Sequence, residues 1–163
     1  MARLKMMVPI SLVFIFILLY LNFRDARPVF LILANIPLAL VGGVIGLKLF
    51  GMYLSVSASV GFIALFGIAI LNGLVMVEFF RTLEAEGKPR RDAVEEGAEM
   101  RLRPVLMTAA TTALGLLPMV WASGVGSEVQ RPLAVVVVFG VVTSTLLTLM
   151  VLPVLYDRLG SKV

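Results

Sequence analysis

An all-α integral membrane protein is the fold class that this sequence predicts, with five transmembrane helices and one short surface helix on the cytoplasmic side. Of the 163 residues, 60% are of the types AVILMFWYC and 15% are charged, whereas about 25% of the residues in a soluble domain are charged. A soluble domain of this length could not bury so much apolar surface. The apolar residues instead fall into five runs, each near the roughly 20 residues that a spanning helix needs. The predicted spans are about 6–23, 28–47, 49–79, 104–124 and 132–156.

The first three spans are justified by the residues that border and interrupt them. The 6–23 run comes after Arg3 and Lys5, as the apolar part of a signal peptide would. It is too long for that role and no small-residue cleavage site comes after it, so we expect a true first span. Pro28 opens the second span, where a missing N–H costs nothing, and Pro37 inside it predicts a kink. The third run is the longest and contains the most polar residues.

The only sizeable polar stretch of the sequence, 81–103, separates the third span from the fourth. Glycine and proline at 87–89 predict a break in the helix. A short helix over about 89–100 comes next, with a narrow apolar face opposite its acids, which is typical of a helix lying on the membrane surface. Pro104 and Pro132 are expected to occupy the first turns of the fourth and fifth spans.

The distribution of basic residues predicts the orientation of the chain in the membrane. Lys and Arg accumulate in short cytoplasmic loops, and ten of the 14 fall on one side of the predicted spans. This places the N-terminus in the periplasm and the C-terminus in the cytoplasm. The ten are Arg24, Arg27, Arg81, Lys88, Arg90, Arg91, Arg101, Arg103, Arg158 and Lys162, against Arg3, Lys5, Lys48 and Arg131 on the other side.

The composition excludes several functional classes. The chain has no Cys and no His, so it has no thiol nucleophile, no imidazole base and no thiolate or imidazole metal ligand. Its net charge of +4 is modest and lies between apolar spans, which excludes a nucleic-acid binder. We therefore expect a protein that is not an enzyme and has no resident cofactor, no metal site and no nucleic-acid partner. The lipid bilayer is its expected surrounding.

Polar side chains inside the spans are the candidate functional residues, because such groups are costly in hydrocarbon and usually have a partner or a role. Asn72 lies deep in the third span, where it either makes an interhelical hydrogen bond or takes part in a proton relay. Glu78 either reaches the cytoplasmic interface, pairs with Arg81, or supports that relay. The hydroxyls of the fourth span predict helix packing when each is taken singly. They are Thr108, Thr111 and Thr112.

Several segments together resemble the resistance-nodulation-division (RND) efflux pumps, most closely the heavy-metal branch of CzcA and CusA type. The segment 57–78 resembles the tenth membrane helix of that family, and 101–108 resembles the start of the eleventh. The stretches 115–118 and 124–129 match the periplasmic end of the eleventh helix. The resemblance covers essentially the whole chain, as helices eight to twelve in order.

The resemblance implies a role in a larger machine. It implies a proton-driven inner-membrane transporter that exports heavy-metal cations, with an N-terminal membrane half and periplasmic domains outside this chain. It also implies a homotrimer that works with a periplasmic adaptor and an outer-membrane channel. Two alternatives remain at this stage: a five-span scaffold or partner subunit that transports nothing, and a pump of the drug-efflux branch.

The resemblance assigns three candidate residues to a proton relay. Arg101 and Thr108 match relay positions of the drug-efflux branch, and Asn72 matches an Asn beside the relay lysine. Thr111, Thr112 and Glu78 are candidate polar support. Leu71 occupies the lysine position, which favours the metal branch and means that the counter-charge either comes from another residue or is missing. The essential acids of the family belong to a helix outside this chain.

Overall fold

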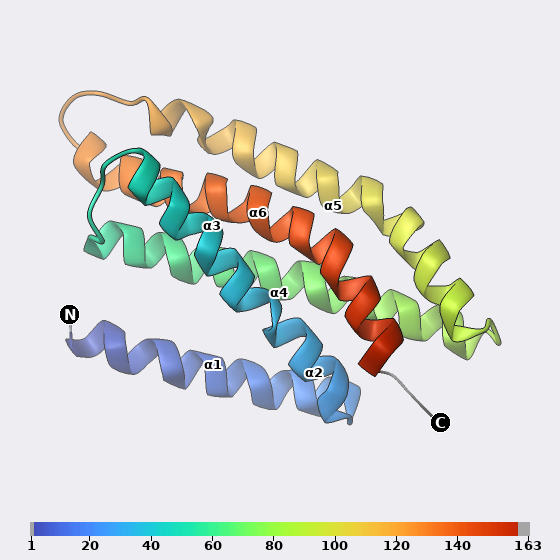
Figure 1. The fold of residues 1–163 in the computed structure, drawn as a ribbon. Coiled ribbons are helices and arrows are strands. Elements are labelled where there is room, and N and C mark those ends of the chain that lie inside the picture. Colours follow the sequence, from blue (N-terminus) through green and yellow to red (C-terminus); the bar gives the residue numbers. More distant parts are fainter. Residues whose placement is uncertain (1, 160–163) are drawn as a thin grey trace.

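The computed structural model describes residues 2–159, which form six helices and no strand (Figure 1). The predicted all-α membrane fold is confirmed, because Val56–Ala85, Arg90–Val120, Ser127–Leu159 and the broken helix Ala26–Leu49 are each long and apolar enough to cross a bilayer. The shorter apolar helix Pro9–Phe23 precedes them. Lys162, one of the residues used to predict orientation, lies outside the described residues. The helices are α1 (Ala2–Phe23), α2 (Ala26–Leu33), α3 (Asn35–Leu49), α4 (Val56–Ala85), α5 (Arg90–Val120) and α6 (Ser127–Leu159).

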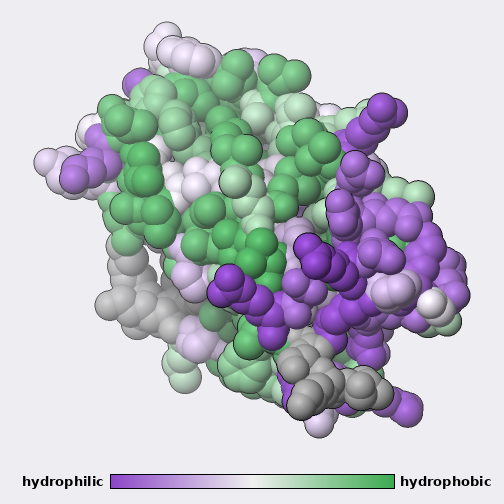
Figure 2. All heavy atoms as spheres, turned by 45° about the vertical axis from the view of Figure 1, so that its right-hand side comes forward, coloured by the Kyte–Doolittle hydropathy of each residue, from purple (hydrophilic) through white to green (hydrophobic). Residues whose placement is uncertain are grey.

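Helix α6 forms the centre of the bundle and packs against α3, α4 and α5. Helix α1 lies at the edge, beside α2 (Figure 1). The α1–α2 and α4–α5 connections, which contain Arg24 and Gly87, lie at one end of the bundle with the end of α6, and the α3–α4 and α5–α6 connections lie at the other (Figure 1). We call these the Gly87 end and the Gly124 end. Hydrophilic side chains gather on one side of Figure 2, and apolar ones cover much of the rest of that face.

The second predicted span is broken, as Pro37 led us to expect. Helix α2 ends at Leu33 and α3 begins at Asn35, with Ala34 between them. Pro37 has no N–H for the carbonyl of Leu33, and its ring crowds that carbonyl. The N–H of Ala34 still bonds to the carbonyl of Phe30 at 2.9 Å, which closes the end of α2. The break therefore results from one residue.

The surface helix predicted over 89–100 is not a separate element, because α5 runs without interruption from Arg90 through Pro104 to Val120. A proline costs the helix one hydrogen bond, and tertiary contacts outweigh that loss here. The first turns of α5 pack on the bundle, where Gly97 lies against the ring of Phe80 and Ala93 is fully buried. The expectation that Pro104 restarts the helix is therefore wrong.

Two other helix starts also differ from the prediction. Helix α6 begins at Ser127, so Pro132 lies beyond its first turn. Helix α4 begins at Val56, several residues after the predicted start at 49, because the Ser55 hydroxyl caps it by accepting the N–H of Ala58 at 3.1 Å. An N-cap side chain of this kind fixes where a helix begins.

Three side chains join α4, α5 and α6 at the Gly87 end. The Tyr156 hydroxyl donates to the Glu84 carboxylate at 3.0 Å. The Arg90 Nε lies 3.5 Å from the same carboxylate, and the Arg90 guanidinium lies 4.8 Å from the centre of the Tyr156 ring. Each group contacts the other two, so the start of α5 is held between the ends of α4 and α6.

Tyr156→Phe is expected to lower the free energy of unfolding by about 1–2 kcal/mol, because it removes one hydrogen bond to a half-buried carboxylate and leaves the ring in place. Thermal unfolding of the protein in detergent measures the change. Tyr53→Phe is the matched control, since Tyr53 is 92% exposed and its hydroxyl can be lost without effect. Equal melting shifts in the two variants would contradict the role assigned to the Tyr156 hydroxyl.

Candidate functional site

Asn72 lies in the middle of α4, on the side that faces α6. It continues a stripe of buried α4 residues with Leu65 and Ala69, and Leu65 packs against Gly140 of α6. Residues three and four apart share one face of a helix, so Asn72 lies on the face of α4 that packs against α6. It is 8% exposed.

Arg101 and Thr108 lie on one face of α5, the face that borders α4. They are seven residues apart, which returns a helix to nearly the same direction, and the Arg101 guanidinium lies 4.5 Å from the centre of the Phe79 ring of α4. Thr108 is exposed, and its hydroxyl donates to the Pro104 carbonyl at 3.0 Å. The Arg101 Nε is buried and has no hydrogen-bond partner among the described residues. This face therefore presents one cation and one hydroxyl beside α4.

The two further threonines of α5 extend this face. Thr112 is half-buried and its hydroxyl donates to the Thr108 carbonyl at 2.8 Å. Thr111 is exposed. Bonds from a hydroxyl to the carbonyl four residues earlier satisfy a polar group within its own helix, so the hydroxyl oxygens remain able to accept a bond from outside.

The packing of α5 on α4 determines which residues of the two helices lie at the same level along the bundle. Gly97 lies against Phe80 and Leu83, and Arg101 lies against Phe79. Because the helices are antiparallel, the same register brings Thr108 to the level of Leu71 and Asn72. Leu71 is 56% exposed. The structure thus joins Arg101 and Thr108 on one surface of α5, and Asn72, seven residues before Phe79, lies on nearly the same side of α4 as the ring that contacts Arg101.

Glu78 lies apart from this surface, toward the Gly87 end. It lines a cleft of about 350 Å³ with Asn22 and Phe23 from the end of α1. The predicted partner Arg81 is engaged elsewhere, since its guanidinium donates to the Phe23 carbonyl at 3.1 Å and lies over the Phe23 ring. Glu78 is exposed, which agrees with the interpretation that it reaches the edge of the membrane.

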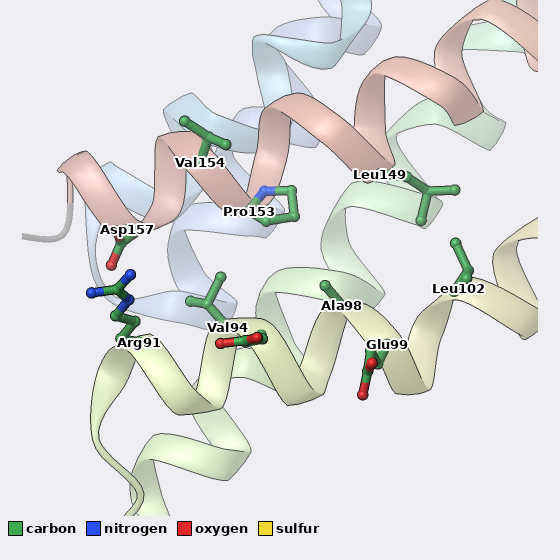
Figure 3. Close-up of a pocket in the computed structure, with 10 residues that line it drawn as sticks. Arg91, Val94, Ala98, Glu99, Leu102, Leu149, Pro153, Val154 and Asp157 are labelled. Atoms are coloured by element: carbon green, nitrogen blue, oxygen red, sulfur yellow. The ribbon is translucent and has the colours of Figure 1, made fainter.

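A larger groove, of about 420 Å³, separates the first half of α5 from the end of α6 (Figure 3). Arg91 and Asp157 point toward one another at its end. Its floor is apolar and cannot replace the hydration shell of a cation, so it is not a candidate metal site. The floor is made by Val94, Ala98, Leu102, Leu149, Pro153 and Val154, and the rim by Arg91, Glu95, Glu99 and Asp157.

Buried polar side chains on α3 and α6 were not singled out by the sequence. Asn35 is 3% exposed, Ser144 3% and Thr148 fully buried. In the sequence they resemble the many small polar residues that support helix packing, and only their burial in the bundle separates them from the rest. Among residues 2–159, no group of three or more His, Cys, Asp or Glu is placed to hold a metal ion.

The fold is that of an all-α integral membrane protein, and comparison with known proteins identifies its family. The sequence pattern of the AcrB/AcrD/AcrF family matches residues 1–159, so the chain belongs to that family. The predicted resemblance to heavy-metal RND pumps is confirmed by its relatives.

Several of the relatives are named for metal resistance or metal efflux. The cobalt-zinc-cadmium resistance protein CzcA of Cupriavidus metallidurans is 52% identical over 154 residues, which are 94% of this chain and 14% of CzcA. Protein HelA of Legionella pneumophila is 56% identical over 155 residues, 94% of this chain and 15% of HelA. A crystal structure of a heavy metal efflux pump superposes with a TM-score of 0.90 at 48% identity, covering 99% of this chain and 16% of that one. The chain thus spans about one seventh of the length of these relatives.

Proposed function

We propose that this chain is the C-terminal membrane part, helices eight to twelve, of a proton-driven pump that exports heavy-metal cations. The observation that carries the proposal is the 52% identity to a cobalt-zinc-cadmium resistance protein over 94% of the chain. In this proposal the chain is part of a secondary active transporter that works by proton antiport. The intact pump is a homotrimer in the bacterial inner membrane, with a periplasmic adaptor and an outer-membrane channel.

The proposed orientation places the Gly87 end in the cytoplasm and the Gly124 end in the periplasm. The basic residues near Gly87 and Arg24 support it, because such residues are retained on the cytoplasmic side. The N-terminus then lies in the periplasm and the C-terminus in the cytoplasm. The metal is recognised outside this chain, by the periplasmic domains of the pump.

Within this proposal, the α4–α5 surface is this chain's side of the proton relay. Arg101 supplies a fixed positive charge and Thr108 a hydroxyl that can pass or hold a hydrogen bond, both facing the membrane half that carries the acids. A positive charge near a buried acid lowers its pKa and favours the ionised form. Asn72 acts from α4, at the same depth. Glu78, Thr111 and Thr112 give polar support along the same helices.

The hydroxyl of Thr108 is expected to be needed for transport. Thr108→Ala and Asn72→Ala should each lower metal export by the whole pump without lowering its amount in the membrane, because neither removes a large packing side chain. Metal resistance of cells and proton-coupled metal uptake by inverted vesicles measure the loss. Thr108→Ser, which keeps a hydroxyl, should retain most of the activity.

Ser59→Ala is the matched control for these variants. The Ser59 hydroxyl donates to the carbonyl of Ser55 at 3.0 Å, in the same way that Thr108 bonds to Pro104, but it lies in the first turn of α4. Export should be unchanged in this variant. If Thr108→Ala and Asn72→Ala both export metal at the parental rate, these residues have no part in the mechanism.

A further inference from the structure

Four buried polar side chains from three helices lie at one level of the bundle. Asn35 of α3 packs over Gly73 of α4, since a Cβ on Gly73 would lie 3.0 Å from the Asn35 Nδ2. Asn72, next to Gly73, faces α6. The polar junction, as we name this set, consists of Asn35, Asn72, Ser144 and Thr148, each at least 92% buried.

The register of α6 brings its two hydroxyls to the junction. Gly140 lies against Leu65 of α4, and Ser144 and Thr148 come one and two helical turns after Gly140 on the same face. Asn72 comes two turns after Leu65 along α4, and the two helices run in the same direction. The same stripe of α6 therefore places Ser144 and Thr148 against Asn72.

Three members of the polar junction have polar atoms without a partner. The Asn35 Nδ2, the Ser144 Oγ and the Thr148 Oγ1 are fully buried and make no hydrogen bond within the described residues. Four hydroxyls in this chain, at Ser59, Thr82, Thr108 and Thr112, are satisfied by the carbonyl four residues earlier, whereas that of Thr145 is also buried without a partner among the described residues. Ser144 and Thr148 also have carbonyls in that position but do not use them. Their hydroxyls are thus available to a ligand in the junction.

The break between α2 and α3 adds a polar backbone group next to Asn35. Asn35 is the first residue of α3, directly after the break (Figure 1). Pro37 has no N–H for the Leu33 carbonyl, so this acceptor loses its usual partner in the helix. Breaks inside membrane helices persist where side chains and ordered water satisfy the freed groups. Buried water molecules in proteins typically make about three hydrogen bonds to such groups.

We propose that the polar junction binds internal water, which bridges Asn35 at the α2–α3 break to Thr148 and Ser144 of α6. Water fits because the partners include an amide donor, hydroxyls that donate and accept, and a carbonyl acceptor. The junction contains no carboxylate to hold a strongly bound cation. The water bridge uses Asn35, Ser144 and Thr148 and neither Arg101 nor Thr108, so it does not depend on the proposed function.

Hydroxyl-radical footprinting of the whole protein in lipid nanodiscs tests the proposal directly. X-rays convert bound water to hydroxyl radicals, which oxidise nearby methionine sulfur. Met76 is fully buried and lies one turn from Asn72. Met76 should be oxidised in the parent, and its rate should fall roughly fivefold or more in the double variant Asn35→Leu, Thr148→Val, which removes the bridging groups. No oxidation of Met76 in the parent, or an unchanged rate in the variant, would overturn the proposal.

Thermal unfolding of a single variant supplies an independent result. Thr148→Val keeps the side-chain shape and removes only the hydroxyl. If water bridges Thr148 to Asn35, the melting temperature falls, and if the hydroxyl is buried dry, removing it raises the melting temperature. Thr82→Val is the control and should melt like the parent, because Thr82 is exposed and bonded within its own helix. A rise in the melting temperature of Thr148→Val would contradict the proposed water bridge, even if metal export were fully intact.

Discussion

Phe80→Ala is expected to lower the free energy of unfolding by about 3–5 kcal/mol, because it removes a buried aromatic ring and leaves a cavity. The Phe80 side chain is fully buried. Its ring lies 5.2 Å from the ring of Tyr156, centre to centre, and contacts Gly97 on α5. One side chain thus fills the space between α4, α5 and α6 at the Gly87 end.

Phe30→Ala is the control for this prediction, because Phe30 is 66% exposed and lies at the edge of the bundle. Thermal unfolding and the amount of protein in the membrane measure both variants. Phe80→Ala should melt many degrees lower and accumulate less, whereas Phe30→Ala should differ little from the parent. Similar behaviour of the two would mean that Phe80 does not hold α5 on the bundle.

Gly42→Ala is expected to destabilise the protein by about 1–3 kcal/mol through overpacking. A Cβ at Gly42 would lie 2.5 Å from the Thr143 Cβ and 2.9 Å from the Phe139 carbonyl oxygen. Neither atom is the free end of a flexible side chain, so α3 and α6 must move apart. The free energy lost to overpacking outweighs the roughly 1 kcal/mol that alanine gains over glycine in helix propensity.

Gly67→Ala supplies the matched comparison within another membrane helix. A Cβ at Gly67 meets nothing within 4 Å, so only the helix propensity changes and the melting temperature should stay level or rise slightly. Both variants replace a glycine by alanine inside a membrane helix. Gly42→Ala should lower the melting temperature, whereas Gly67→Ala should not. If Gly42→Ala raised the melting temperature, α3 and α6 would have to pack less closely than these distances indicate.

Much of the fold could be predicted from composition and order along the chain. Apolar length alone predicts the spans, because hydrocarbon forces the backbone to satisfy its hydrogen bonds within each helix. Pro37 predicts the break between α2 and α3 for the same local reason. The prediction at Pro104 is wrong because it treats a proline as a boundary. Whether a helix continues through a proline depends on the packing around it, here the contact of Gly97 with Phe80.

The candidate site, like the fold, could be predicted only in part. Apolar runs and local motifs are properties of neighbouring residues, so they were enough to predict the membrane class, the family resemblance and the candidates Arg101 and Thr108. The sequence could not determine that Asn72 is buried whereas its neighbour Leu71 is exposed. Nor could it separate Asn35 and Thr148 from the many polar residues that only pack. Those distinctions depend on which helix lies against which face, and contacts between residues far apart in the chain exist only in the tertiary structure.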